Sequence, residues 1–468
     1  MRKAIVWGFG VLVSGLVALT PRDADACGGC FVPPESSSVV TDHRMALSLS
    51  PGQTTLYDQI RYSGDPASFA WVLPTVGQVS VGLSADTMFS ALDQTTRVAI
   101  LAPPRNCPPP PVCPNESRDF NAPPPQAGSA ADSGVTVLAK EVVGPYETVQ
   151  LRATDPGALA QWLAGNGFTI PPDVQPVISR YVAEKFDFLA LKLVPGKGVR
   201  DMRPVRVTTP GASPVLPLRM VAAGTGALVG ITLWVVAEGR YETQNFPQFY
   251  IPTSDLAWDW TQNRSNYVDL RKLKTDAGGG RIWELEASVA VNRAGIASAV
   301  KFPVFTGGPG PVGNGYEAIK DADGKIVKTS DEVADLDVAT LFAGVGPGKE
   351  RVTRIRADLA HQALDRDLTL IASKDQSAVP TLRQVTKELN QPLCPVFKGC
   401  AQVGTAPRDQ AAAQQEQEVA NGGGTVEGGG LACASTGHGR RTFMGDPLVL
   451  GLGFGFLALA VARKRRRN

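Results

Sequence analysis

Cysteine and histidine are the side chains in this sequence with the clearest chemical potential, and both are scarce. The 468 residues include seven cysteines and three histidines. Six of the cysteines form three closely spaced pairs: Cys27 with Cys30, Cys107 with Cys113, and Cys394 with Cys400. Such pairs in an exported chain predict disulfides. Pairing between neighbours is the simplest arrangement, although the spacing leaves crossed pairings open.

The first pair also has the spacing of a redox motif. Cys27 and Cys30 are separated by two glycines, as in the CxxC of thiol–disulfide oxidoreductases. In those enzymes the motif opens a helix, whose N-terminus lowers the pKa of the thiol. Here the segment Phe31–Pro34 ends in two prolines and cannot start a helix in that way. A structural disulfide is therefore favoured, with a redox centre and a metal site as alternatives.

The histidines offer one candidate for catalysis. His361 lies shortly before Asp365 and Asp367, so a base and a carboxylate of a secreted hydrolase could come together there. We expect His43 to be an ordinary surface or strand-end residue. A site of three histidines for zinc would need more histidines than the chain holds outside its C-terminal tail, and HExxH is absent. The sequence therefore assigns no catalytic, cofactor-binding or metal-ligating residue, and an enzyme is the less favoured interpretation.

Three short motifs resemble functional ones but lack their context. Gly82–Asp86 is not a nucleophile elbow, and Ser84 within it is better suited to cap a helix. Gly308–Gly313 has the glycine spacing of a dinucleotide-binding loop, but its prolines predict a rigid loop without a helix behind it. Asp321–Gly324 lacks the remaining ligands of a calcium loop and predicts a turn.

Four aromatic side chains could form a flat platform for a sugar ring: Trp258, Trp260, Tyr250 and Tyr267. Aromatic residues in a region of this size lie more often in a hydrophobic core. We therefore expect these residues to be core residues.

The first 26 residues have the pattern of an export signal. They combine a basic start, an apolar stretch over Ala4–Leu19 and a small-residue cleavage pattern at Ala24–Ala26. This predicts a secretory signal peptide. The apolar stretch is shorter than the roughly 20 residues that a membrane span needs, so an N-terminal anchor is less favoured. Lipidation at Cys27 is also less favoured, because the residues before it do not form a lipobox.

The C-terminal tail has a specific order. Cys433 is followed by a short polar spacer, the uncharged apolar run Pro447–Ala462 and the basic cluster Arg463–Arg467. As a helix, the apolar run would extend about 24 Å, somewhat short of the roughly 30 Å hydrocarbon core. The order resembles the MYXO-CTERM sorting tail of myxobacterial surface proteins. That resemblance implies that Cys433 is a processing and lipidation site and that the hydrophobic segment is removed. A plain transmembrane helix with an inner basic cluster is the alternative.

The two ends also dominate the charge. Ten of the 46 lysines and arginines lie in residues 1–26 and 434–468, against three of the 44 acidic residues. The region between them is therefore mildly acidic and has no basic stripe, which argues against nucleic acid as a partner. Its length and the 43% apolar composition of the chain are sufficient for a core in one large or two ordinary domains.

The periodicity of the sequence predicts both strands and helices. Strands are predicted at Val39–Leu49, Gln53–Tyr62, Ser68–Pro74, Val135–Val143, Glu147–Ala153, Phe186–Val194, Leu228–Ala237 and Arg281–Val291, and a hairpin at Glu317–Lys328. Helices are predicted at Ser84–Thr96, from Asp155 to Gly165, and within Pro172–Lys185. In Arg281–Val291 the alternation would place Glu284 and Glu286 on a solvent-exposed face. Because regular βαβ alternation is absent, we expect an α+β fold with mostly antiparallel sheets, a few packed helices and disulfides.

Composition divides the chain into successive parts. After the signal peptide, residues 27–404 are expected to form a secreted ectodomain, in which the proline-rich segment 102–134 would be an exposed loop. Residues 405–432 are polar and then glycine-rich, which predicts a flexible tether. Residues 433–468 form the sorting tail.

Three segments carry a resemblance to a known family. They are the mature start Ala26–Phe31, the run Phe69–Pro74, and the region from Tyr146 through Asp155 to Ala190. They are similar to the bacterial secreted family catalogued as domain of unknown function 2330, over roughly residues 26–400. The family has no known activity, so the resemblance implies a single exported module and contributes no catalytic residues.

Together these features predict an exported cell-envelope protein that is anchored at the cell surface or outer membrane through its tail. It would act as a non-catalytic binding or structural module, without a cofactor. Its partners would be the export and sorting machinery, the membrane, and an envelope or extracellular component. A hydrolase using His361 and a thiol–disulfide oxidoreductase using Cys27 and Cys30 are the alternatives.

Overall fold

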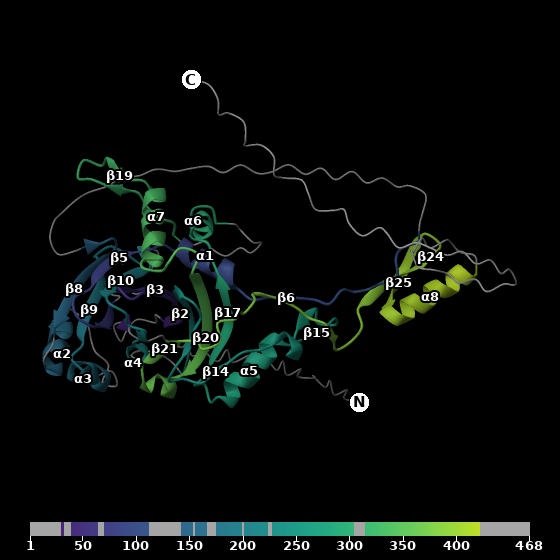
Figure 1. Cartoon of the computed structure of the whole chain (residues 1–468), viewed down its shortest axis with the longest axis horizontal. Coiled ribbons are helices and arrows are strands. Elements are labelled where there is room, and N and C mark those ends of the chain that lie inside the picture. The colour runs from purple at the N-terminus through teal and green to yellow at the C-terminus, as the bar shows by residue number, and fades with distance from the viewer. Residues whose placement is uncertain are drawn as a thin grey trace, which may run out of the picture.

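Two β-sheets pack face to face, and helices cover the outer face of each sheet, which gives four layers (Figure 1). A narrow arm leaves this body on one side. The computed structural model describes residues 30–31, 39–63, 70–111, 142–152, 155–165, 175–198, 201–222, 227–303 and 314–421.

The two sheets contain most of the strands. The larger sheet has the order β14 (Gln248–Phe249), β17 (Trp283–Ala290), β20 (Glu350–Ala360), β12 (Leu228–Glu238), β2 (Val39–Leu49), β3 (Gln53–Ser63), β10 (Val205–Pro210) and β5 (Ser80–Leu83). The smaller sheet has the order β1 (Cys30–Phe31), β4 (Ala70–Thr75), β9 (Asp187–Leu193), β8 (Tyr146–Arg152) and β7 (Val142–Val143). Among the described strands, the pairing is antiparallel except in four pairs, which include β2 with β12. The predicted α+β class is confirmed.

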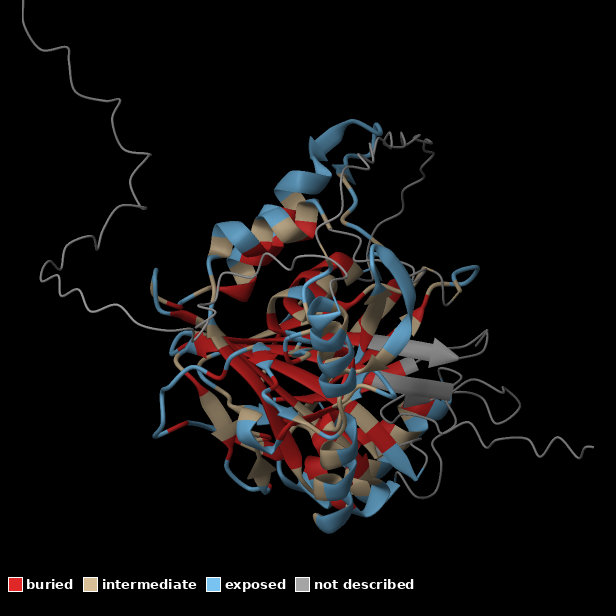
Figure 2. Cartoon of the chain, turned by 90° about the vertical axis from the view of Figure 1, so that its right-hand side faces the viewer, coloured by how far each residue is buried: buried red, intermediate tan, exposed pale blue. Residues whose placement is uncertain are grey.

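The helices form the two outer layers. The larger sheet is covered by α1 (Asp86–Thr96), α6 (Arg293–Lys301) and α7 (Ser330–Leu341). The smaller sheet is covered by α2 (Pro156–Gly165) and α3 (Gln175–Ala183), and by the short α4 (Leu218–Val221). Figure 2 shows that buried residues gather in the central sheets, while the helices are exposed on their outer sides.

Strand β2 shows how the sequence builds these layers. Met45, Leu47 and Leu49 point into the core between the sheets, whereas Ala46 packs toward the helices. This is the alternation expected of a strand. Its neighbour β12 is apolar on both faces: Leu233 lies between the sheets and Trp234 lies under the helices. A strand at the centre of a sheet that is covered on both sides has to be apolar throughout.

Most predicted elements lie close to their predicted positions. They are β2, β3, β4, α1, β8, α2, α3, β9, β12, β17 and the hairpin of β18 (Ile319–Lys320) and β19 (Ile326–Lys328). In that hairpin, Gly324 has a φ of 79°, as the predicted Asp-Gly turn requires. Of the strand predicted at Val135–Val143, only β7 lies within the described residues. Most of the proline-rich segment is also outside them, and its residues 102–111 have no regular structure.

Strand β17 corrects one prediction. Its Glu284 and Glu286 are 2% and 3% exposed, so they do not lie on a solvent-exposed face. Arg271 of α5 (Tyr267–Ala277) binds both carboxylates, with N–O distances of 2.6 Å. Arg354 of β20 binds Glu286 from the other side. Alternation in the sequence cannot distinguish a face that meets water from a face that meets arginine side chains.

Ser84 corrects another prediction, because it does not cap α1. The N-cap residue is Ala85, and no side chain caps this helix. The Ser84 hydroxyl instead donates a hydrogen bond of 2.5 Å to the carboxylate of Asp337, which is buried in α7. Arg206 of β10 and Tyr316 also donate to this carboxylate. These hydrogen bonds to Asp337 thus attach α7 to the edge of the larger sheet.

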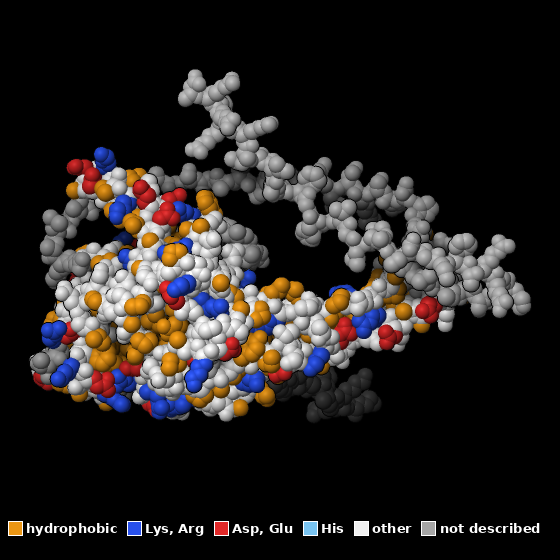
Figure 3. All heavy atoms as spheres, in the orientation of Figure 1, with side chains coloured by type: hydrophobic (Ala, Val, Ile, Leu, Met, Phe, Trp, Pro, Cys, Tyr) orange, Lys and Arg blue, Asp and Glu red, His pale blue; other side chains and the backbone are white. Residues whose placement is uncertain are grey.

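Two segments that lie far apart in the sequence, residues 99–111 and 382–420, form the arm, and residues 257–259 join them at its base (Figure 1). Its base contains two parallel pairs, β6 (Ala99–Leu101) with β22 (Leu382–Gln384) and β15 (Ala257–Asp259) with β23 (Lys387–Glu388). Its tip is the antiparallel hairpin of β24 (Leu393–Lys398) and β25 (Ala401–Pro407), followed directly by α8 (Arg408–Ala420). The structure thus places a strand end and a helix where the sequence suggested the start of a tether. Figure 3 shows hydrophobic and charged side chains interspersed along the arm.

Short elements complete the description. A three-stranded sheet has the order β11 (Val215–Leu216), β21 (Leu368–Ala372) and β13 (Tyr241–Thr243), and β16 (Arg264–Ser265) pairs with β15. In the part of the chain that the structure describes, no helix is long and apolar enough to cross a membrane. The apolar run Pro447–Ala462 lies outside that part.

The buried pairing of Glu286 leads to a stability prediction. We expect Glu286→Ala to lower the free energy of unfolding by about 1.5–3 kcal/mol, because Arg271 and Arg354 would each lose a buried carboxylate partner and keep only Glu284 and Asp93. Glu317→Ala is a matched control, since Glu317 also pairs with an arginine but is 77% exposed. Its loss should stay within about 1 kcal/mol. Urea denaturation measures the free energy of unfolding of both variants. Equal losses of stability would contradict the assignment of Glu286 to a buried ion-pair network.

Candidate functional site

A disulfide joins the two segments of the arm. Cys107 and Cys394 are bonded, with a Cα–Cα distance of 5.4 Å and 287 residues between them in the sequence. Cys400 is disulfide-bonded as well. The simplest prediction, pairing between neighbours, is therefore wrong for Cys107 and Cys394. Spacing could not reveal this, because the fold brings residues 107 and 394 together through the strand pairing at the base of the arm.

The remaining cysteines give less information. Cys27, Cys113 and Cys433 lie outside the described residues. The backbone of Cys30 belongs to β1 and is paired with that of Trp71 in β4. The second cysteine of the CxxC motif thus begins a strand and not a helix, so the motif lacks the helix N-terminus that activates thioredoxin-like thiols.

Ion pairs and ring contacts reinforce the arm around the disulfide. Arg408 at the start of α8 binds Glu388, with an N–O distance of 2.9 Å. The indole of Trp260 also donates to Glu388, and the guanidinium of Arg105 lies over that indole, 5.1 Å from the ring centroid. The amide of Gln415 in α8 donates to the backbone oxygen of residue 109. These contacts hold α8 and the hairpin to the first segment of the arm.

The aromatic residues proposed for a sugar platform are packed within the protein. Trp258 and Tyr267 are buried in a hydrophobic cluster, with Trp260 packed against them. Tyr250 is half-buried and packs against the core between the sheets. The expectation that these residues belong to the core is confirmed.

The hydrolase candidate does not present free carboxylates. His361 is exposed in the 3₁₀-helix η3 (His361–Asp365). Hydrogen bonds from Arg366 and Arg281 hold the pKa of Asp365 well below its usual range. Asp367 binds Arg219 at 2.6 Å and accepts a hydrogen bond of 2.5 Å from the Tyr181 hydroxyl. Arginines neutralise both carboxylates, which weakens either one as the partner of an imidazole base.

The Asp321–Gly324 motif forms the turn that the sequence predicts. The Asp321 carboxylate accepts hydrogen bonds from the backbone of Asp323 and Lys325, so this segment is a turn. Gly308–Gly313 lies outside the described residues. Where the structure describes the chain, it contains no group of three or more His, Cys, Asp or Glu side chains that could hold a metal ion.

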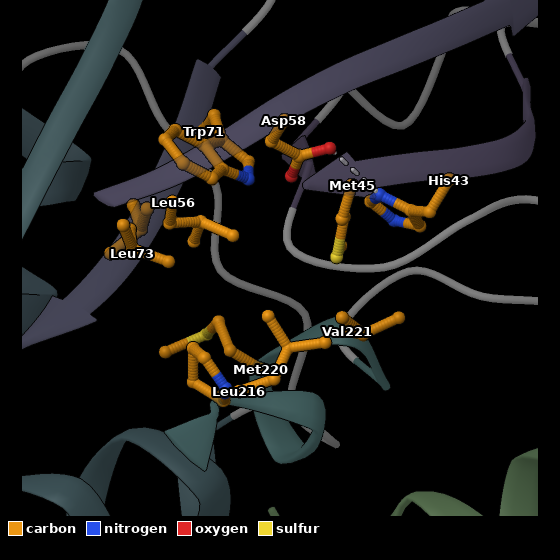
Figure 4. Close-up of a pocket in the computed structure, with 11 residues that line it drawn as sticks. His43, Met45, Leu56, Asp58, Trp71, Leu73, Leu216, Met220 and Val221 are labelled. Carbon is orange, nitrogen blue, oxygen red and sulfur yellow. Dashed lines mark hydrogen bonds and ion pairs between the residues drawn. The ribbon is translucent and has the colours of Figure 1, made fainter. Parts of the chain in front are cut away.

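His43 is buried, which corrects the expectation of a surface or strand-end residue. Its side chain is 1% exposed, and that of Asp58 in β3 is 2% exposed. The distance from His43 Nδ1 to Asp58 Oδ1 is 3.4 Å. Both residues line a small cavity of about 20 Å³ between the sheets, enough for water-sized occupants. Figure 4 shows Trp71, Asp58 and His43 on one side of this cavity and Leu216, Met220 and Val221 on the opposite side.

A second, smaller cavity lies beyond Asp58 and Trp71. Its volume is about 10 Å³, and its wall includes Tyr146, Met202 and Arg203. The Tyr146 hydroxyl donates to the backbone oxygen of Arg203 and accepts from its backbone nitrogen, with distances of 2.7 and 2.9 Å. Burial raises the pKa of Tyr146 well above its usual value. Asp58 thus stands between two cavities inside the sandwich.

The sequence contains part of the information that locates His43 and Asp58. His43 has the same parity in β2 as Met45 and Leu47, so the alternation of the strand already points it inward. Asp58 likewise has the parity of Leu56 in β3. The register pairs Met45 with Asp58, and that register was the missing information.

Comparison with known proteins identifies the family. A family model described as an uncharacterised protein conserved in bacteria, DUF2330, matches residues 21–297. The chain belongs to this family. The match ends inside α6, so β20, η3 and the second segment of the arm lie beyond it. The matched range is therefore shorter than residues 26–400, over which the sequence resembles the family. No curated protein and no solved structure matches the chain.

The long disulfide leads to a second stability prediction. Replacing Cys107 and Cys394 together by serine should lower the free energy of unfolding by about 2–4 kcal/mol, because the unfolded chain loses the constraint of a long loop. The control Asp409→Asn removes an exposed charge that pairs with Arg408 in the same arm and should cost at most about 1 kcal/mol. Denaturant unfolding under non-reducing conditions measures both. An unchanged stability of the double serine variant would contradict the prediction.

Proposed function

We propose that this member of the DUF2330 family is an exported, non-catalytic module of the bacterial cell envelope, held at the surface through its C-terminal tail. The observation that carries the proposal is the disulfide between Cys107 and Cys394. Disulfides of this kind persist in oxidising compartments and are rare in the cytosol. The predicted signal peptide over residues 1–26 supplies the route to such a compartment.

The chemistry of the described residues supports a binding or structural role. Carboxylates that could take part in catalysis are paired with arginines, such as Asp365 with Arg281 and Asp367 with Arg219. Four of the five buried acids among the described residues are likewise paired with arginines, as Glu286 is with Arg354. A carboxylate held by a guanidinium is stabilised in its charged form and is a weak proton acceptor.

The position of the arm fits anchoring at the C-terminal side. The last described helix, α8, ends at Ala420, and the glycine-rich residues 421–433 lead from it to Cys433. Thirteen residues of chain can span at most about 45 Å. If Cys433 carries the lipid, the end of α8 therefore lies within about 45 Å of the membrane surface.

The state of Cys433 in protein from native membranes tests the proposal. We expect non-reducing peptide mass spectrometry to find a lipid-modified Cys433 and no peptides beyond it. Cys433→Ser should prevent the modification and release the protein from the surface, measured by protease accessibility on intact cells. An unmodified tail that ends at Asn468 would instead indicate a transmembrane anchor. A defined catalytic turnover by the purified protein would contradict the non-catalytic role.

A further inference from the structure

Asp58 differs from the other buried acids of the protein. Four more carboxylates are buried among the described residues, and each is paired with an arginine: Glu284 with Arg271, Glu286 with Arg271 and Arg354, Asp337 with Arg206, and Glu350 with Arg293. The Asp58 side chain is 2% exposed and has no lysine or arginine partner in the described chain. Its one side-chain hydrogen-bond contact there is His43 Nδ1, at 3.4 Å.

That single contact is a weak compensation for a buried charge. A distance of 3.4 Å is longer than the roughly 2.7–3.2 Å of ordinary hydrogen bonds to nitrogen. An imidazole supplies a positive charge only when it is protonated, whereas a guanidinium is always charged. Taking a carboxylate out of water without a counter-charge costs several kcal/mol, which explains why the other buried acids are paired with arginines. The environment of Asp58 therefore favours an occupant that carries a positive charge.

The walls around Asp58 narrow the choice of occupant. Apart from His43, the first cavity is lined mainly by apolar side chains, among them Trp71, Leu56 and Val221. In Figure 4 the nitrogen-bearing edge of the Trp71 indole is turned toward the carboxylate of Asp58, and both residues line the two cavities. An apolar wall, an indole and one carboxylate are complementary to an alkylammonium group, which combines a positive charge with an apolar body.

Three methionine side chains line the two cavities next to Asp58 and make their walls deformable. Met45 and Met220 line the first cavity and Met202 lines the second, so three of the six methionines in the sequence adjoin Asp58. Methionine is unbranched and changes its conformation readily, which lets it fill irregular gaps and yield to a ligand. The cavities of about 20 and 10 Å³ can therefore merge around a small molecule when these side chains move.

We propose that the space around Asp58, between the two sheets, is a binding site for a small organic cation of the primary alkylammonium type. The Asp58 carboxylate binds the ammonium group next to the Trp71 indole, and the methionine-lined walls receive the alkyl chain. This site goes beyond the proposed envelope role. It depends on the sandwich alone and is independent of how the tail is anchored.

Calorimetric titration of the purified protein tests the site with defined probes. Methylammonium, ethylammonium and butylammonium chloride are titrated at constant ionic strength, with methanol, ethanol and butanol as neutral matches. We expect saturable binding of the amines and none of the alcohols. Equal responses to both series, or no saturable binding of any amine, would overturn the proposal.

Variants identify the residues that bind the amine. Asp58→Asn should weaken binding about tenfold or more, since it removes a charge-assisted hydrogen bond. Asp269→Asn is the matched control, because Asp269 is an exposed aspartate far from the cavity in the sequence, and it should leave binding unchanged. His43→Gln keeps a polar neighbour and should retain binding. Amine binding that survives Asp58→Asn would refute the site.

A second variant keeps the test decisive if Asp58→Asn fails to fold. Met220→Phe fills the first cavity and leaves Asp58 in place, so binding of butylammonium should be lost more than that of methylammonium. Undiminished binding of butylammonium would place the ligand elsewhere. Because these titrations need no membrane, their failure leaves the mass-spectrometric test of Cys433 untouched.

Discussion

Burial of both faces of the larger sheet is the constraint on which the rest of the structure depends. At its centre, β12 contributes Leu233 to the core between the sheets and Trp234 to the core under the helices. A sheet in this position has no face for water, so one layer must cover each side. The smaller sheet covers one face, and α1, α6 and α7 cover the other. The outer helices α2 and α3 are required in turn, because the smaller sheet has its own apolar outer face.

The burial of both sheet faces also determines which charged side chains need a partner of opposite charge. An acid on a covered sheet needs a counter-charge, and β17 obtains one from an arginine in α5 and another in β20. Arginines pair in this way with four of the five buried carboxylates among the described residues. Asp58 is the exception in the interior, since it faces a cavity and a histidine. His43, which sequence analysis placed at the surface or at a strand end, thus lies beside a buried carboxylate that has no arginine or lysine partner among the described residues.

Local patterns predicted the elements well and their partners poorly. The alternation of β2 and the capping residues around α2 are encoded within a few residues, so these elements could be predicted from the sequence. The pairing of Cys107 with Cys394, the arginines that cover Glu284 and Glu286, and the contact of Ser84 with Asp337 all join residues far apart in the chain. No periodicity contains that information. His43 is instructive because its inward parity was visible, whereas its partner Asp58 required the register between β2 and β3.

The arm shows how a long-range disulfide and a surface anchor can be connected mechanically. If the tail holds the protein at a membrane, any force on the body passes through α8 and the β24–β25 hairpin. The hairpin alone would resist weakly, because a two-stranded sheet has marginal stability. Cys394 lies in that hairpin, and its bond to Cys107 transfers the force to the segment that follows β6 and α1. The disulfide therefore links the hairpin of the arm to a helix of the core by a covalent route that bypasses the residues between 107 and 394. The arm, whose hairpin is weak on its own, is the part of the fold that gains most from such a bond.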